Sequence, residues 1–279
     1  SSAGYALGYL SGGVLLLINL AWIMKPTSFG FADTVSAIRW SFVSVAVWWA
    51  VFSIPLFRSV PEPPTTGSHD GSSVAAAFTR LSKTFHEIRR YRHAFLLFIA
   101  MLLYQDGIQT IIRMSSVYGA EIGIEQTMQI AAFVMVQFVG IPCAFLFGAL
   151  GSRFGTKRLI FFSIGVYIVA ASLAYLMTSV VHFFLLAFLI ATVLGGSQAL
   201  SRALFARLIP PDRTSEFFGF YAVSERFATV FGPALFTISA LLTGSSRSAI
   251  LAIIGLFLAG AFVLSLVDEA AGTRAARPG

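Results

Sequence analysis

Residues 94–118 read AFLLFIAMLLYQDGIQTIIRMSSVY. The hydrocarbon core of a bilayer is about 30 Å thick, and a helix needs about 20 apolar residues to cross it. This run therefore predicts a membrane-spanning helix. It carries Asp106 near its middle, where a charged side chain costs about 2.5–3.5 kcal/mol. A charge retained at that depth marks a candidate functional site.

Seven further segments have the same character, and together they predict an all-α polytopic membrane protein with eight transmembrane helices. The chain of 279 residues is 57% hydrophobic and 11% charged, whereas a soluble domain averages about 25% charged residues. This composition excludes a soluble core of this length. The other segments span residues 4–24, 37–57, 127–150, 158–179, 182–207, 216–242 and 248–267.

The positive charges predict the orientation of these helices. The net charge is +7, but the cations are concentrated in alternate loops and the tail, which argues for a positive-inside membrane topology and against nucleic acid as a partner. Both ends of the chain are then cytoplasmic. The residues assigned to the cytoplasm are Arg58, Arg80, Lys83, Arg89, Arg90, Arg92, Arg153, Lys157, Arg158, Arg207, Arg213, Arg274 and Arg277.

The segment between the second and third spans differs in composition. Residues 61–73 are rich in Pro, Gly and Ser and predict a flexible linker. Apolar residues then recur at helical spacing, from Val74 through Leu81 and Phe85 to Ile88. This pattern predicts an amphipathic helix that lies on the cytoplasmic membrane surface or against the helix ends.

The layout of two helices, a long cytoplasmic linker and six helices resembles helices five to twelve of a major facilitator transporter. The stretch GALGSRFGTKR at 148–158 resembles the cytoplasmic loop motif of that superfamily, although Ser152 stands where an Asp is expected. The resemblance implies a gating or structural role in this loop for Gly148, Arg153, Gly155, Lys157 and Arg158.

Four stretches, at residues 2–9, 104–111, 195–202 and 216–226, resemble the autophagy-related vacuolar amino-acid effluxer family, especially its bacterial members. The resemblance implies that residues 1–58 are the last two helices of an N-terminal half and that 93–267 are the C-terminal half. Residues 59–92 are then the cytoplasmic linker and 268–279 a cytoplasmic tail. Because the chain starts at Ser1 without Met, we expect a fragment whose four preceding helices are missing.

Polar residues within the third span form the first candidate site. Asp106, Gln109 and Arg113 are spaced at i, i+3 and i+7, which puts them on one face of a helix near the membrane midplane. Asp106 can bind a proton or a substrate ammonium group, and Gln109 can bind substrate. The alternative is that Asp106 pairs with a cation elsewhere and fixes the bundle, while Arg113 reaches the membrane interface.

Two further pairs extend the candidate site. Gln198 and Arg202 are spaced at i, i+4 in the sixth span, and the Arg202 guanidinium suits a substrate carboxylate or a pair with Glu225. Glu225 and Arg226 lie in the seventh span. Glu225 is either a proton-coupling carboxylate or part of a cytoplasmic-side ion pair that closes the inward gate, and we expect a gating or structural role for Arg226.

The sequence contains no pattern typical of a disulfide, a metal site or an enzyme active site. The single cysteine, Cys143, allows no intramolecular disulfide, and the four histidines are too scattered for a metal site. The sequence contains neither a phosphate-binding glycine loop nor a nucleophile elbow. We therefore expect no enzyme, no cofactor and no metal.

These observations and the resemblance together predict a secondary active transporter that works by alternating access. The expected partners are a small-molecule substrate (an amino acid or a similar zwitterion), membrane lipid and protons as the coupling ion, and the expected direction is efflux. The alternatives are a non-transporting membrane scaffold or sensor with a transporter fold, and a lipid or drug exporter.

Overall fold

The computed structural model describes residues 2–60 and 74–277, and every regular element in these ranges is a helix. The predicted flexible linker, 61–73, lies outside the described residues. The long helices are α1 (Ser2–Met24), α2 (Thr34–Ser59), α4 (Arg92–Glu121), α5 (Gln126–Phe154), α6 (Thr156–Ala174), α7 (Val180–Leu208) and α10 (Ser246–Ser265), with α8 (Thr214–Ala228) and α9 (Phe231–Thr243) in series. The shorter elements are α3 (Val74–Ile88), α11 (Glu269–Ala276), η1 (Pro26–Phe29) and η2 (Pro211–Arg213).

Seven candidate spans in the described part of the chain are long and apolar enough to cross a membrane. The count rises to eight when α10 and α11, which meet at a bend of 65°, are taken as one broken span. The predicted all-α polytopic architecture is confirmed, and the predicted eight segments correspond to the upper count.

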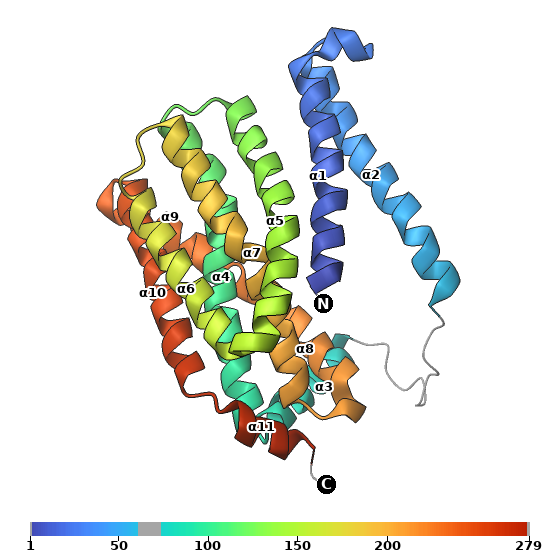
Figure 1. Cartoon of the computed structure of the whole chain (residues 1–279), viewed down its shortest axis with the longest axis vertical. Coiled ribbons are helices and arrows are strands. Elements are labelled where there is room, and N and C mark those ends of the chain that lie inside the picture. The colour runs from blue at the N-terminus through green and yellow to red at the C-terminus, as the bar shows by residue number, and fades with distance from the viewer. Residues whose placement is uncertain (1, 61–73, 278–279) are drawn as a thin grey trace.

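The spans form a bundle with a hairpin beside it (Figure 1). The hairpin is α1 and α2, and α1 packs against α5 and α7 of the bundle. Within the bundle the main helix pairs are α5 with α7, α4 with α10, and α6 with α7. The hairpin and the bundle thus meet mainly along α1.

Large aromatic residues fill the bundle core, and two buried tyrosines anchor its helix pairs. The Tyr104 hydroxyl donates to Ser201 Oγ across 2.6 Å, and the Tyr167 hydroxyl lies 3.2 Å from Ser197 Oγ. Both tyrosines are almost completely buried. A buried phenol needs a hydrogen-bond partner, so these contacts fix α4 and α6 against α7.

The seventh span is broken where the sequence predicts one continuous helix over 216–242. Helix α8 ends at Ala228 and α9 begins at Phe231. Pro233 has no N–H with which to bond the carbonyl of Thr229, four residues earlier. Gly232 beside it packs so close to Thr110 and Asp106 of α4 that no side chain fits there. The break therefore arises from Gly232 and Pro233.

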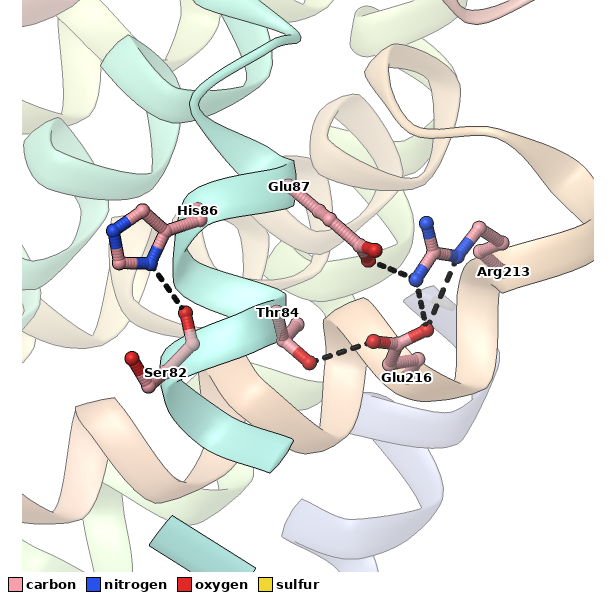
Figure 2. Close-up of polar contacts among 6 residues, drawn as sticks. All are labelled: Ser82, Thr84, His86, Glu87, Arg213 and Glu216. Atoms are coloured by element: carbon pink, nitrogen blue, oxygen red, sulfur yellow. Dashed lines mark hydrogen bonds and ion pairs between the residues drawn. The ribbon is translucent and has the colours of Figure 1, made fainter. Parts of the chain in front are cut away.

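The predicted amphipathic helix is present as α3, and it packs against α8 and α4 rather than standing alone. Ile88 is fully buried and Thr84 is nearly so. Thr84 donates to Glu216 across 2.6 Å, and Arg213 pairs with both Glu216, at 2.6 Å, and Glu87. Figure 2 shows the Arg213 guanidinium reaching both carboxylates. We call Thr84, Glu87, Arg213 and Glu216 the α3–α8 latch.

The predicted tail contains a docked helix, α11, which lies with α3 and α8 at one end of the bundle (Figure 1). It packs against α7 and α4. Lys157, at the start of α6, donates through Nζ to the carbonyls of Ser265 and Val267 at the end of α10. In return Glu269 Oε1 accepts from the backbone N–H of Lys157 at 3.2 Å. Each charge therefore lies at the helix end that its sign stabilises.

Candidate solute-binding site

A polar cavity of about 280 Å³ lies between the hairpin and the bundle. Its walls come from α1, α4, α7, α8 and the break after α8. The residues that line it are Tyr5, Gln105, Gln109, Arg113, Gln198, Arg202, Glu225, Arg226 and Thr229. The structure thus brings together five of the six predicted substrate or coupling residues, together with Arg226, which was predicted to serve a gate.

The α4 wall is a stripe of three residues, Gln105, Gln109 and Arg113, at spacings of four. This spacing places them on one helical face. Gln105 is 2% exposed, and its Oε1 has no hydrogen-bond partner among the described residues. A buried amide oxygen without a partner costs about 1–3 kcal/mol, so this atom is available to a donor group on a ligand. Sequence reasoning missed Gln105, although its position four residues before Gln109 was a usable signal.

Asp106 does not line the polar cavity. Its side chain is 3% exposed and lies against α9, where a Cβ on Gly232 would be 2.8 Å from Asp106 Oδ1. That oxygen has no hydrogen-bond partner among the described residues. The predicted common face of Asp106, Gln109 and Arg113 is therefore divided, because Asp106 faces the neighbouring helix while the other two face the cavity.

Arg202 forms the centre of a charged and aromatic cluster. Its Nη2 lies 3.8 Å from Glu225 Oε2. Its guanidinium carbon is 5.9 Å from the ring centre of Tyr5 and 6.0 Å from that of Tyr221. Both rings are within cation–π range. Of the two partners that the sequence allowed for Arg202, the structure shows Glu225. The Arg202 side chain is still 47% exposed, so its face remains accessible.

Arg113 closes the cavity at the break in the seventh span. Its Nη1 donates to the carbonyl of Thr229 across 3.5 Å. That carbonyl is the one that Pro233 cannot bond. Arg113 therefore belongs to the cavity wall and also supplies a hydrogen bond to the Thr229 carbonyl at the end of α8.

A second, larger cavity of about 480 Å³ lies deeper in the bundle and is mostly apolar. Its walls include Tyr9, Phe133, Phe183 and Ile250. Gln198 lines both cavities, so its side chain forms part of the wall that separates them.

The predicted loop motif forms the joint between α5 and α6. Gly155, the one residue between them, has a φ of 92°, which favours glycine. Lys157 binds the end of α10, and Arg207 of α7 donates to Thr156 Oγ1 at 2.5 Å. Arg153 lies over the ring of Phe154 at 5.5 Å, and the structure shows no ion pair for Arg158 among the described residues. Ser152, at the position where Asp was expected, donates only to the carbonyl of Ala149.

No group of three or more metal-binding side chains occurs among the described residues. The apolar spans, with a polar cavity at their junction with a helical hairpin, define a polytopic membrane protein of the major facilitator fold. The family model described as "Vacuole effluxer Atg22 like" matches residues 1–277, and the chain belongs to this family.

Two relatives illustrate the range of this similarity. The chain is 36% identical, over 274 residues, to "Uncharacterized MFS-type transporter YxiO" of Bacillus subtilis (strain 168), with 98% of this chain and 64% of the relative covered. It is 27% identical, over 303 residues, to "Autophagy-related protein 22-1" of Neosartorya fischeri, covering 98% of this chain and 48% of the relative. The chain thus spans about half to two thirds of the length of these relatives.

Proposed function

We propose that the full-length protein is a secondary active transporter that exports a small zwitterion, an amino acid or a close analogue, by alternating access. The observation that carries this proposal is the polar cavity, which gathers three arginines, a glutamate and three amides between apolar helices. Charged groups at membrane depth are costly, and they mark solute or ion pathways. The family supports transport, and a vacuolar effluxer relationship supports export.

The cavity offers separate partners for the two charges of a zwitterion. The guanidinium of Arg202 presents a planar fork that suits a carboxylate. Glu225, 3.8 Å from Arg202, and the free Oε1 of Gln105 suit an ammonium group. Substrate binding then competes with the Arg202–Glu225 pair, and this competition links binding to a change in the contact between α7 and α8.

Two carboxylates are candidates for coupling transport to protons. Glu225 lines the cavity, and Asp106 lies buried beside the break in the seventh span. Residues 1–58 and 93–267 act as parts of two halves that rock about the cavity, with four further helices in the full-length protein. The joint between α5 and α6 gates the cytoplasmic side through Gly148, Arg153, Gly155, Lys157 and Arg158. The protein lies in a bacterial inner membrane, with both ends of this chain cytoplasmic.

Counterflow of labelled amino acids in proteoliposomes of the full-length protein tests the proposal, with and without an imposed pH gradient. We expect at least one amino acid to accumulate, with a rate that rises with the gradient. Glu225→Gln should remove the dependence on the gradient, whereas Asp212→Asn, an exposed carboxylate outside the cavity, should retain it. Absence of counterflow for the whole panel with folded protein would reject amino acids as substrates.

A further inference from the structure

The end of α3, the turn that follows it and the start of α4 carry four exposed cations. Lys83, Arg89, Arg90 and Arg92 are exposed, and none of them forms an ion pair with another described residue. Glu87 and Glu216, the two acidic side chains nearby, both bind Arg213, and Glu216 is also attracted to Lys83. A cluster of positive charge is therefore left over at this end of the bundle.

The α3–α8 latch fixes the direction in which this basic surface points. Thr84 and Ile88 are buried against the bundle. Lys83 precedes the buried Thr84, and Arg89 and Arg90 follow the buried Ile88, while Glu87 is held by Arg213 (Figure 2). With these contacts made, the basic side chains stay on the outer surface. The Arg89 guanidinium lies 5.8 Å from the ring centre of Phe85, within cation–π range.

Helix length places this surface at the level of the lipid headgroups. Helix α4 contains 30 residues, and at 1.5 Å per residue it is about 45 Å long. This matches a bilayer of about 40–45 Å including its headgroup regions. Arg92 is the first residue of α4. Arg90 and Arg89 are two and three residues away from it, within about 11 Å along the chain.

We propose that Lys83, Arg89, Arg90 and Arg92 form a binding surface for the headgroups of anionic phospholipids. The argument rests on charge complementarity, since the cytoplasmic leaflet is anionic and attracts basic segments next to a membrane helix. It also rests on the position of Arg92 at headgroup depth. This inference is independent of the transported substrate. It makes α3 a contact between the bilayer and α8, the helix that carries Glu225 and Arg226.

The test uses the full-length protein purified in a zwitterionic detergent. It measures the thermal unfolding of the protein after lipid is added. We expect phosphatidylglycerol, but not phosphatidylcholine, to raise the melting temperature, because a ligand that binds only the native state stabilises it. Arg89→Gln combined with Arg90→Gln should weaken phosphatidylglycerol binding about 30-fold, given the attraction of each cation to an anionic surface. The effect should diminish in high salt.

The matched control is Lys25→Gln combined with Arg39→Gln, which removes two exposed cations from the other end of the spans. This variant should keep the full response to phosphatidylglycerol. An equal loss in both double variants, an equal response to phosphatidylcholine, or displacement of the lipid by millimolar inorganic phosphate would each overturn the proposal. None of these outcomes bears on transport, so failure here is distinguishable from failure of the proposed function.

Discussion

Arg113 of α4 occupies the hydrogen-bonding position that Pro233 leaves empty, by donating to the carbonyl of Thr229 across 3.5 Å. Seven residues earlier on the same helix, Asp106 lies against Gly232 near the start of α9. A cation therefore lies at the C-terminal end of α8 and an anion at the N-terminal end of α9, each where the helix dipole favours it. Helix α4 holds the break in the seventh span from both sides.

The first prediction concerns the close packing at this break. Gly232→Ala should destabilise the protein by about 1–3 kcal/mol, because its new methyl group would overlap Thr110 and press on Asp106. Gly219→Ala in α8 is the control, since nothing lies within 4 Å of a Cβ there. It should be neutral or stabilise by up to about 1 kcal/mol, as helix propensity dictates. Thermal unfolding of the purified protein measures both, and equal effects would contradict the packing argument.

The second prediction separates substrate binding from a purely structural role for Arg202. Arg202→Gln should abolish counterflow, and Arg202→Lys should raise the KM about tenfold, because an ammonium group cannot bind a carboxylate through a planar fork. If Arg202 serves only to neutralise Glu225, then Arg202→Gln combined with Glu225→Gln will restore transport. We expect the double variant to remain inactive. Arg39→Lys, on an exposed part of α2, serves as the control for the change of cation.

A third prediction addresses the α3–α8 latch. Arg213→Gln leaves Glu87 and Glu216 without their shared cation, so α3 should exchange its backbone amides faster. The side chains are partly exposed, and a pair of this kind is worth up to about 1 kcal/mol. We therefore expect about a fivefold increase in hydrogen exchange within residues 74–88. Glu87→Gln should give a smaller increase because Arg213 keeps Glu216, and Arg277→Gln should give none. Equal protection in all variants would show that the ion pairs of Arg213 do not hold α3.

The fourth prediction is that the stability of α11 depends on pH. Its N-terminal residue Asp268 accepts a hydrogen bond from the N–H of Ala271 at 2.9 Å, and this bond lowers the pKa of Asp268 below its usual 3.8. A lowered pKa in the folded state means that the cap stabilises α11 above about pH 4 and that this stability is lost as the pH falls through the lowered value.

A nitroxide label on Ala275→Cys, in a Cys143→Ala background, reports this change. Its mobile fraction should rise as the pH falls below about 4, where the carboxylate takes up a proton. Asp268→Asn is the matched control, because an amide caps a helix without titrating. If this variant shows the same rise, another group is responsible.

Hydropathy predicted the spans well because lipid imposes one requirement on every membrane helix, a long apolar run. The joint at Gly155 and the helix α3 also followed from local signals. The break in the seventh span did not, because its apolar run is continuous. Gly232 and Pro233 were the signal, and the close approach of Asp106 and Thr110 shows why glycine is needed there.

The candidate site was predictable in composition but not in arrangement. Charged and amide residues inside apolar runs identified Gln109, Arg113, Gln198, Arg202 and Glu225, and all of them line the cavity. Helical spacing alone cannot tell which side of α4 faces a neighbour, so Asp106 was grouped with the cavity and Gln105 was missed. Tyr5 was also missed, since an aromatic residue near the end of a span usually indicates the membrane interface.

Helix α8 connects the α3–α8 latch to the polar cavity. Its first turn is held by the α3–α8 latch and its last turns carry Glu225 and Arg226. Its 15 residues make a rod about 22 Å long, and the break after Ala228 separates it from α9. As a lever pivoting at the latch, it would move its far end by about 1 Å for a tilt of about 3°, a displacement large enough to remake or lose a hydrogen bond. Small forces applied at the membrane surface would thus be delivered to the cavity as a change in its shape.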